Sequence, residues 1–245
     1  MLKFSKPLQM GVLIKRYKRF FADVRMGDEI VVAHCANTGT MRTCADPGMN
    51  VWLSPAESAE RKLRWTWEYT EIADGGLIGV NTSRPNKVVE LAVKAALESG
   101  KKSELATLFA GYQSVRGEVK YGKSSRIDLL LSGHSSGRDC YVEVKNTTLF
   151  DSASNSVQFP DAVTERGLKH LEELAAMVKS GQRAVMFYLV NRPDGREFRP
   201  AIAVDPAYCE GIRKAAKAGV EFIAWRADNR VDGSTLGSSL PVVLS

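Results

Sequence analysis

Two carboxylates and a lysine stand on neighbouring apolar segments near the middle of the chain. Asp128 lies near the start of "RIDLLLS", and Glu143 and Lys145 are two residues apart in "CYVEVKN". Side chains alternate across a β-strand, so Glu143 and Lys145 face one side while Val142 and Val144 face the other. If the two strands pair, Asp128 reaches the same polar side.

Two converging carboxylates are ligands that Mg²⁺ or Mn²⁺ accepts, together with water and phosphate oxygens. A cation held by Asp128 and Glu143 lowers the pKa of a bound water and neutralises charge on a scissile phosphate. Lys145 then orients the water or stabilises the developing negative charge. The residues therefore predict a site that hydrolyses phosphodiesters. The spacing leaves a structural alternative open, in which two half-exposed strands simply turn polar side chains to water.

The elements around these residues alternate between helices and strands from residue 85 onward. Apart from a second short helical stretch after the first helix, the segments in chain order are "NKVVELAVKAALESG", "QSVRGEVKYG", "RIDLLLS", "CYVEVKN", "TERGLKHLEELAAMVKSG", "RAVMFYLV", "DPAYCEGIRKAAKAG" and "VEFIAWR". This interleaving predicts an α/β domain over residues 85–245, with helices on both faces of a mixed sheet. The last two segments, separated by Gly219, indicate a helix and a strand rather than a helix-turn-helix. Sequence-specific readout of DNA is therefore not expected from this region.

Residues 1–84 consist of short strand-like runs separated by turns. "NTGTM", "ADPGMN" and "DGG" are turn signals, and Trp65, Trp67 and Tyr69 alternate with polar residues in "RKLRWTWEYTEIA". Several short strands at this spacing predict a small β-barrel of the oligonucleotide-binding (OB) type.

The chain is basic, with a net charge of +6, and up to Arg25 seven Lys or Arg residues stand against Asp23 alone. Such a bias favours a polyanionic partner such as DNA. No run is long enough for a membrane helix, no secretory signal is evident, and the four cysteines are scattered. We therefore expect a cytoplasmic protein that contacts no membrane. The three histidines are isolated from one another in the sequence and predict no zinc site.

Basic residues beside aromatic residues or at a helix start are the expected DNA contacts. Bases can stack on Trp65 and Trp67 while neighbouring cations hold phosphates, unless both tryptophans belong to the barrel core. Thr164 and Arg166 open a helix, where a phosphate is stabilised, although Thr164 can equally act as a plain helix cap. The complete set of predicted DNA contacts is Lys15, Arg16, Lys18, Arg19, Arg61, Lys62, Arg64, Thr164 and Arg166.

The chain resembles the sugar fermentation stimulation protein A (SfsA) family over nearly its whole length. Its aspartate and "E-V-K" pattern is similar to that of the PD-(D/E)XK nuclease superfamily. The stretches that carry the likeness are "KRYKRFFADV", "AHCANTGTM", "VWLS", "RKLRWTWE", "GLIGVNTSRPN", "GEVKYGKSSRIDLLL", "YVEVKNTTL", "FPDAVTERGLKHLEEL" and "VDPAY".

The resemblance implies a bacterial or archaeal protein with an OB-like barrel at 1–84 and a PD-(D/E)XK nuclease-like domain at 85–245. It also implies sequence-independent DNA binding and a regulatory role in sugar metabolism, particularly that of maltose. Carried onto this chain, the nuclease motif is Asp128, Glu143 and Lys145, with Mg²⁺ or Mn²⁺ as the metal and Ile127 where the superfamily name has proline. The superfamily often adds a glutamate, for which the candidates are Glu90, Glu104 and Glu118. The alternative is a DNA-binding regulatory protein whose nuclease site is vestigial and does not catalyse.

Overall fold

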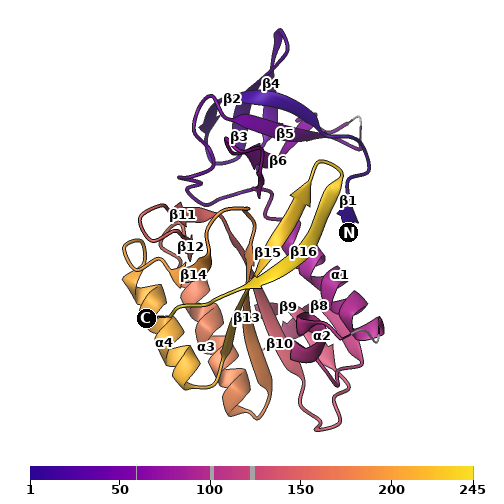
Figure 1. Ribbon diagram of the computed structural model, residues 1–245, viewed down its shortest axis with the longest axis vertical. Helices are drawn as coiled ribbons and strands as arrows, with labels where there is room; N and C mark the ends of the chain where they lie inside the picture. Colours follow the sequence, from indigo (N-terminus) through magenta and orange to yellow (C-terminus); the bar gives the residue numbers. More distant parts are fainter. Residues whose placement is uncertain (59, 100–101, 122–124, 245) are drawn as a thin grey trace.

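The protein is described from a computed structural model that covers residues 1–58, 60–99, 102–121 and 125–244. Its N-terminal part is a small barrel (Figure 1). The barrel strands are β2 (Gln9–Tyr17), β3 (Phe21–Met26), β4 (Glu29–His34), β5 (Asn50–Pro55) and β6 (Trp65–Glu71), followed by the short β7 (Leu77–Gly79). They pair in the order β4-β3-β2-β5-β6-β7, and a parallel pairing of β4 with β6 closes the ring. This closed five-stranded arrangement confirms the predicted OB-like barrel.

Alternating side chains fill the interior of the barrel. Leu13, Val24, Ala33 and Leu53 are buried there, and Trp67 belongs to the same cluster with none of its surface exposed. The indole N–H of Trp67 donates to the backbone oxygen of Tyr69 at 3.0 Å. Trp67 is therefore a core residue and is not free to stack on a base.

The rest of the chain forms an α/β domain, as predicted. Its main elements are β1 (Leu2–Lys3), α1 (Pro85–Glu98), α2 (Glu104–Leu108), β8 (Ser114–Tyr121), β9 (Ser125–Ser132), β10 (Cys140–Thr147), α3 (Glu165–Lys179), β13 (Arg183–Val190), α4 (Pro206–Lys217), β15 (Glu221–Arg230) and β16 (Gly233–Leu240). The sheet has seven strands in the order β1-β16-β15-β13-β10-β9-β8. β10, β13 and β15 run parallel to one another, and the flanking pairings are antiparallel.

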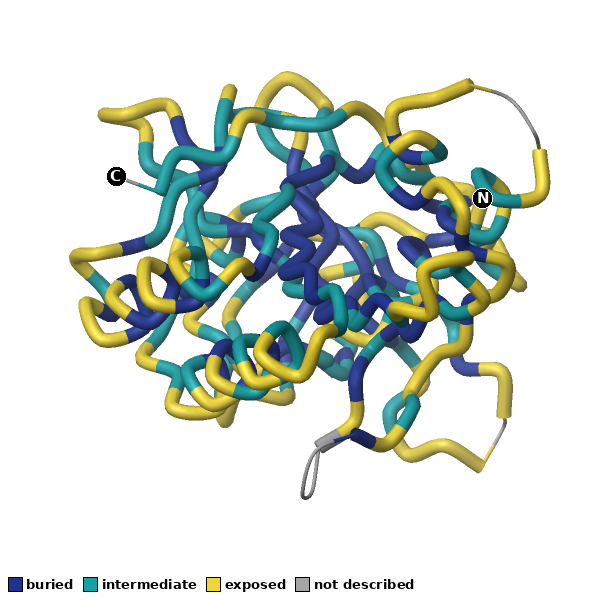
Figure 2. The backbone as a smooth tube through the Cα atoms, turned by 90° about the horizontal axis from the view of Figure 1, so that it is seen from below, coloured by how far each residue is buried: buried dark blue, intermediate teal, exposed yellow. Residues whose placement is uncertain are grey.

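Helices cover both faces of this sheet. Phe187 and its alternate neighbours pack with residues of α1 and α2, whereas Tyr188 and its alternate neighbours pack with residues of α3 and α4. The central strands appear as the dark blue centre of the molecule in Figure 2. β13 is thus buried on both faces, which explains its almost wholly apolar sequence. In the part of the chain that the structure describes, no helix is long and apolar enough to cross a membrane.

Several short elements carry no sequence pattern that would predict them. The two-residue β1 leaves the barrel segment and pairs with the edge strand β16 of the α/β domain. A separate sheet of β11 (Leu149–Asp151), β12 (Ser156–Phe159) and β14 (Glu197–Pro200) lies between the barrel and α3 (Figure 1). Strands of two to four residues are too short to show a period. The α4–Gly219–β15 segment is helix, turn and strand, as predicted, with Gly219 at φ +99°.

Three asparagines join the two domains at the end of the central strands. Asn146 and Asn191 bond to each other at 2.9 Å, and Asn229 donates to Asn191 at 2.7 Å. Asn146 and Asn229 also donate to the backbone oxygens of Gly79 and Leu77 in the barrel segment. A side chain on Gly79 would collide with Asn191, so the barrel approaches the sheet as closely as backbone allows.

Candidate metal and nucleic-acid site

The pairing of β9 with β10 ends where the predicted motif begins. The last paired residues are Leu129 and Val142, so continued pairing would set Asp128 opposite Glu143. Instead, the Asp128 carboxylate accepts the backbone N–H of Val144 at 2.7 Å. Its other oxygen accepts from Asn86 of α1, also at 2.7 Å. The aspartate thus takes over a donor that the strand ladder would otherwise use.

Asp128 is poorly suited to carry its charge without a counterion. Burial is the main cause that raises its pKa, and the nearby Glu143 carboxylate adds to the effect, giving a value of about 6. A bound cation would reverse both effects, because it stabilises the ionised forms of the two acids.

Glu143 is almost completely buried, at 2% exposure, and its two oxygens differ sharply. Oε1 accepts from Lys145 Nζ at 2.6 Å and also contacts His170 Nδ1. Burial alone would raise the pKa of Glu143, but the hydrogen bond from His170 and the charge of Lys145 outweigh it and lower the pKa. Oε2 has no hydrogen-bond partner among the described residues. Leaving a buried acceptor unpaired costs roughly 1–3 kcal/mol, and more for a charged group.

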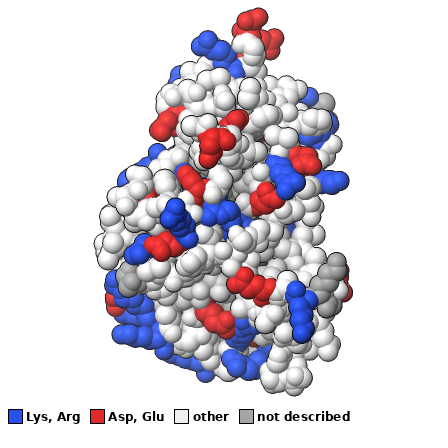
Figure 3. Space-filling view, viewed as in Figure 1, with Lys and Arg blue, Asp and Glu red and all other residues white. Residues whose placement is uncertain are grey.

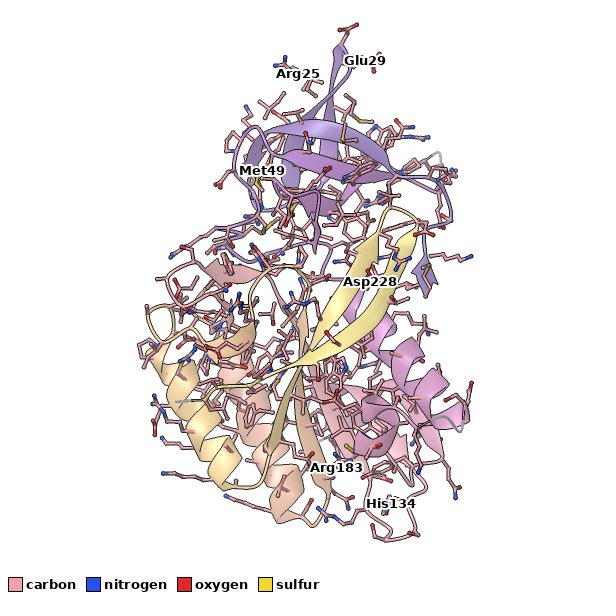
Figure 4. All side chains as sticks on the ribbon, viewed as in Figure 1. Arg25, Glu29, Met49, His134, Arg183 and Asp228 are labelled. Carbon is pink, nitrogen blue, oxygen red and sulfur yellow. The ribbon has the colours of Figure 1, made fainter. Side chains whose placement is uncertain are left out.

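His170 is a member of this site that the sequence does not single out. It lies on the buried face of α3 with Gly167, Leu171 and Leu174, and this helical spacing is the only signal that could have drawn attention to it. The other two histidines lie elsewhere: His34 contacts Arg61 in the barrel, and His134 lies at the far end of the α/β domain (Figure 4).

The three glutamates considered as a further ligand have different surroundings. Glu118 interrupts the β8–β9 pairing at a φ of +55°, is exposed, and accepts weakly from Asn86 at 3.4 Å. Glu90 pairs with Lys87 at 2.8 Å and Lys94 at 2.5 Å. Glu104 accepts from Ser239 of β16. Over the described ranges, no group of three or more His, Cys, Asp or Glu side chains is arranged to hold a metal.

The site therefore offers two protein carboxylates, Asp128 and Glu143. This set fits Mg²⁺ or Mn²⁺, because Mg²⁺ keeps several waters and is usually held by one or two carboxylates plus phosphate oxygens. The unpaired, buried Oε2 of Glu143 is the atom that such an ion would satisfy.

A cleft of about 660 Å³ opens beside these residues, between the barrel and the α/β domain. Lys145 and Asn86 line it on the motif side, and the barrel loop at 37–40 lines it on the other. Of the nine predicted DNA contacts, the structure brings four to this cleft: Arg16, Arg19, Thr164 and Arg166.

These four residues have different partners within the cleft. The Arg16 guanidinium donates to the backbone oxygens of Arg19, Asn37, Gly39 and Thr40, so it shapes the loop. Thr164 caps α3 by accepting from the Gly167 N–H at 3.0 Å, which is the helix-cap role that the sequence also allows. Arg166 is exposed and its Nε lies 3.4 Å from His170 Nε2. Arg19 is exposed at a turn, with φ +62°.

The other five predicted contacts lie outside the cleft. Lys15 forms a surface ion pair with Asp23 at 3.5 Å, and Lys18 is exposed in the turn before β3. Arg61 donates to Thr66 at 3.0 Å, while Lys62 and Arg64 are exposed in the loop before β6. On the face seen in Figure 3, basic and acidic side chains are interspersed over the upper part of the molecule, and basic ones gather along its lower left edge. Arg25, also counted in the basic N-terminal excess, marks the tip of the barrel away from the α/β domain (Figure 4).

An OB barrel joined to a mixed α/β domain, with a half-buried aspartate and a buried glutamate beside a lysine that lines the cleft between the two domains, defines a distinctive two-domain architecture. Two family models match it in turn: the SfsA N-terminal OB domain over residues 14–80 and the sugar fermentation stimulation protein RE domain over residues 83–233. The chain therefore belongs to the sugar fermentation stimulation protein (SfsA) family, as its resemblance implied.

Individual relatives match nearly the full length of the chain. A sugar fermentation stimulation protein homolog of Paramagnetospirillum magneticum is 50% identical over 245 residues, covering 100% of this chain and 99% of that protein. One from Geotalea uraniireducens is 48% identical over 237 residues, covering 96% and 97%. The structure is similar to that of Pyrococcus furiosus SfsA in complex with Ca²⁺, with a TM-score of 0.84, 26% identity and 99% coverage of both chains.

Proposed function

We propose that this protein binds DNA in the cleft between its domains, mainly through the phosphate backbone, and hydrolyses phosphodiesters with a divalent cation. The observation that carries the proposal is the Asp128–Glu143 pair, in which one buried carboxylate oxygen has no hydrogen-bond partner among the described residues. A pair of this kind is costly without a cation and favourable with one.

Asp128 and Glu143 would hold the cation, with water and substrate phosphate oxygens as the remaining ligands. When bound, the cation would lower the pKa of a water ligand and neutralise charge on the phosphate. Mg²⁺ and Mn²⁺ are the ions we propose. The description of the P. furiosus relative as a Ca²⁺ complex supports a divalent cation on this fold without indicating which ion this chain uses.

The side chains of the cleft supply the remaining functions. Lys145 lines the cleft and lies within 2.6 Å of Glu143 Oε1, where its ammonium can stabilise negative charge that develops on a phosphate held nearby. Arg19 and Arg166 are exposed cations on opposite walls, suited to the backbone phosphates of one strand. The first turn of α3, capped by Thr164, presents backbone N–H groups beside Arg166.

The family name and the cysteines support a proposal for the cellular role and location of the protein. Relatives called sugar fermentation stimulation proteins support a role for this protein in sugar fermentation. We propose that the protein exerts this role through DNA binding, as a regulator of sugar metabolism and particularly that of maltose. Cys35, Cys44, Cys140 and Cys209 are all buried free thiols, which supports a reducing, cytoplasmic location.

A second candidate function is DNA binding with a nuclease site that no longer catalyses. It is favoured by the contacts of Glu143 Oε1, because Lys145 already balances the charge of this carboxylate without a cation and His170 contacts the same oxygen.

Purified protein incubated with Mg²⁺ or Mn²⁺ and end-labelled single-stranded, duplex or branched DNA separates these functions. We expect cleavage that requires the cation and disappears in Glu143→Gln and in Lys145→Gln, with DNA binding retained. Lys217→Gln, which changes an exposed charge on α4, is the matched control and should cleave normally. Binding by the wild type without cleavage of any of the substrates would favour the non-catalytic alternative, and the absence of both would contradict the proposal.

A further inference from the structure

His170 joins the motif to the wall of the cleft. Its side chain is 7% exposed, and its Nδ1 contacts Glu143 Oε1 and lies 3.0 Å from Lys145 Nζ. On the other side of the ring, Nε2 lies 3.4 Å from the Nε of Arg166. The proposed function gives this buried imidazole no role.

The neighbours of the ring decide which nitrogen carries the proton. An arginine Nε–H can only donate, so Nε2 is the acceptor in this contact. In a neutral imidazole the proton then resides on Nδ1, which donates to Glu143 Oε1. The reverse tautomer would set two lone pairs against each other at Glu143 and two N–H groups against each other at Arg166. Lys145 Nζ lies 3.0 Å from Nδ1, and in this tautomer the two groups are neighbouring donors to the same Glu143 oxygen.

Oε1 of Glu143 consequently accepts from two donors, Lys145 and His170. Oε2 has no hydrogen-bond partner among the described residues. Exchanging the two oxygens would break both bonds to Oε1, so the carboxylate keeps Oε2 as its free acceptor. Residues that orient a ligating carboxylate in this way typically change metal affinity by about 10–100-fold when they are removed.

We propose that His170, held in its Nδ1–H tautomer by Arg166, is a positioning residue that presents Glu143 Oε2 to the divalent cation. The inference rests on the proposed function, since it concerns the same cation. It connects the exposed Arg166 on the cleft wall, through His170, to the Glu143 carboxylate that would hold the ion.

Two substitutions distinguish positioning through Nδ1 from a general packing role. The side-chain amide of asparagine places its N–H group close to the position of a histidine Nδ1–H. That of glutamine reaches the position of Nε2 instead. His170→Asn should therefore keep the hydrogen bond to Glu143, whereas His170→Gln should lose it although it fills more of the space.

The experiment is calorimetric titration of the full-length protein with Mn²⁺. We expect His170→Asn to bind within about threefold of the wild type, and His170→Gln and His170→Ala to bind about 10–100-fold more weakly. Arg166→Ala should weaken Mn²⁺ binding by a smaller factor. The variant no longer holds His170 in its Nδ1–H tautomer, but it keeps the imidazole that donates to Glu143. Glu172→Gln, an exposed residue on the same helix, is the matched control and should leave Mn²⁺ binding unchanged.

Equal affinity of the Asn, Gln and wild-type proteins would overturn the inference while leaving the proposed cation site standing. Equal loss in the Asn and Gln variants would also overturn it, since it would indicate packing alone. If the wild type binds no Mn²⁺, the proposed function and this inference fail together.

Histidine ¹H–¹⁵N spectra of the cation-free wild type test the tautomer separately. A proton found on Nε2 of His170 would contradict the inference whatever the metal affinity. A proton on Nδ1 is the expected result.

Discussion

Replacing Asp128 with asparagine is expected to stabilise the cation-free protein at pH 8 and to abolish the stabilisation that Mg²⁺ or Mn²⁺ confers. The reason is the raised pKa of this carboxyl, about 6 against an ordinary value of 3.8, caused first by burial and then by Glu143. One pKa unit corresponds to about 1.4 kcal/mol, so keeping Asp128 ionised in the folded state costs about 3 kcal/mol.

Asparagine removes that cost but disturbs one hydrogen bond. Its oxygen can still accept the Val144 N–H, whereas its NH₂ group meets the donating amide of Asn86. Losing that bond costs about 1 kcal/mol, which leaves a net gain of about 2 kcal/mol. For a chain of this size the gain raises Tm by about 4–8 °C at pH 8.

The sign of the pH dependence follows from proton counts. Between about pH 4 and pH 6 the folded state holds a proton on Asp128 that the unfolded state has lost, so the wild type loses stability as pH rises through this window. Glu143 has a lowered pKa and contributes in the opposite direction. The informative quantity is therefore the difference between variant and wild type, which should grow from pH 4 to pH 6 and stay constant above it.

Thermal unfolding with EDTA from pH 4 to pH 8, repeated with saturating Mn²⁺, measures both effects. A bound cation at 100 times its Kd stabilises the folded state by about 2.7 kcal/mol, and only the wild type should show this gain. If the variant is less stable than the wild type at pH 8, with a difference that does not vary with pH, the assignment of a raised pKa to Asp128 is wrong.

Three further perturbations test other parts of the account. Arg19→Gln should weaken binding to all DNA sequences alike and reduce the slope of log K against log salt by about 0.9, as gel-shift titrations over a salt series would show, whereas Lys217→Gln should leave both unchanged. Arg16→Gln should destabilise the protein by about 2–3 kcal/mol in chemical denaturation, because its guanidinium holds four carbonyls of the cleft loop; an effect below 0.5 kcal/mol would contradict that structural role. Asn191→Ala should cost about 1–3 kcal/mol by leaving its amide partners at the domain junction unpaired, and an unchanged denaturation midpoint would show that the junction does not depend on it.

Local patterns in the sequence predict much of this fold because each pattern reflects burial. The apolar run of β13 indicates a strand buried on both faces, and the period of α3 indicates its length and the face that packs on the sheet. The alternation of β10 also places Glu143 and Lys145 on the same side, where they pair at 2.6 Å.

Contacts between distant segments leave no such pattern. Asn86 reaches Asp128 across 42 residues of sequence, and His170 reaches Lys145 across 25. In the sequence, Arg16 looks like any basic residue of a solvated strand. Only the structure shows that its guanidinium donates to the loop at 37–40. For the same reason the sequence leaves the roles of Trp67 and Thr164 open between binding and structure. In the structure Trp67 lies in the barrel core and Thr164 caps α3.

Titration calorimetry with Mn²⁺ on the wild type, Asp128→Asn and Glu143→Gln tests whether the two carboxylates hold a divalent cation. We expect one cation site per chain in the wild type and its loss in both variants, because each removes one of the two carboxylates. Wild-type protein that binds no Mn²⁺, or variants that bind it as tightly as the wild type, would contradict the claim that Asp128 and Glu143 form a divalent-cation site.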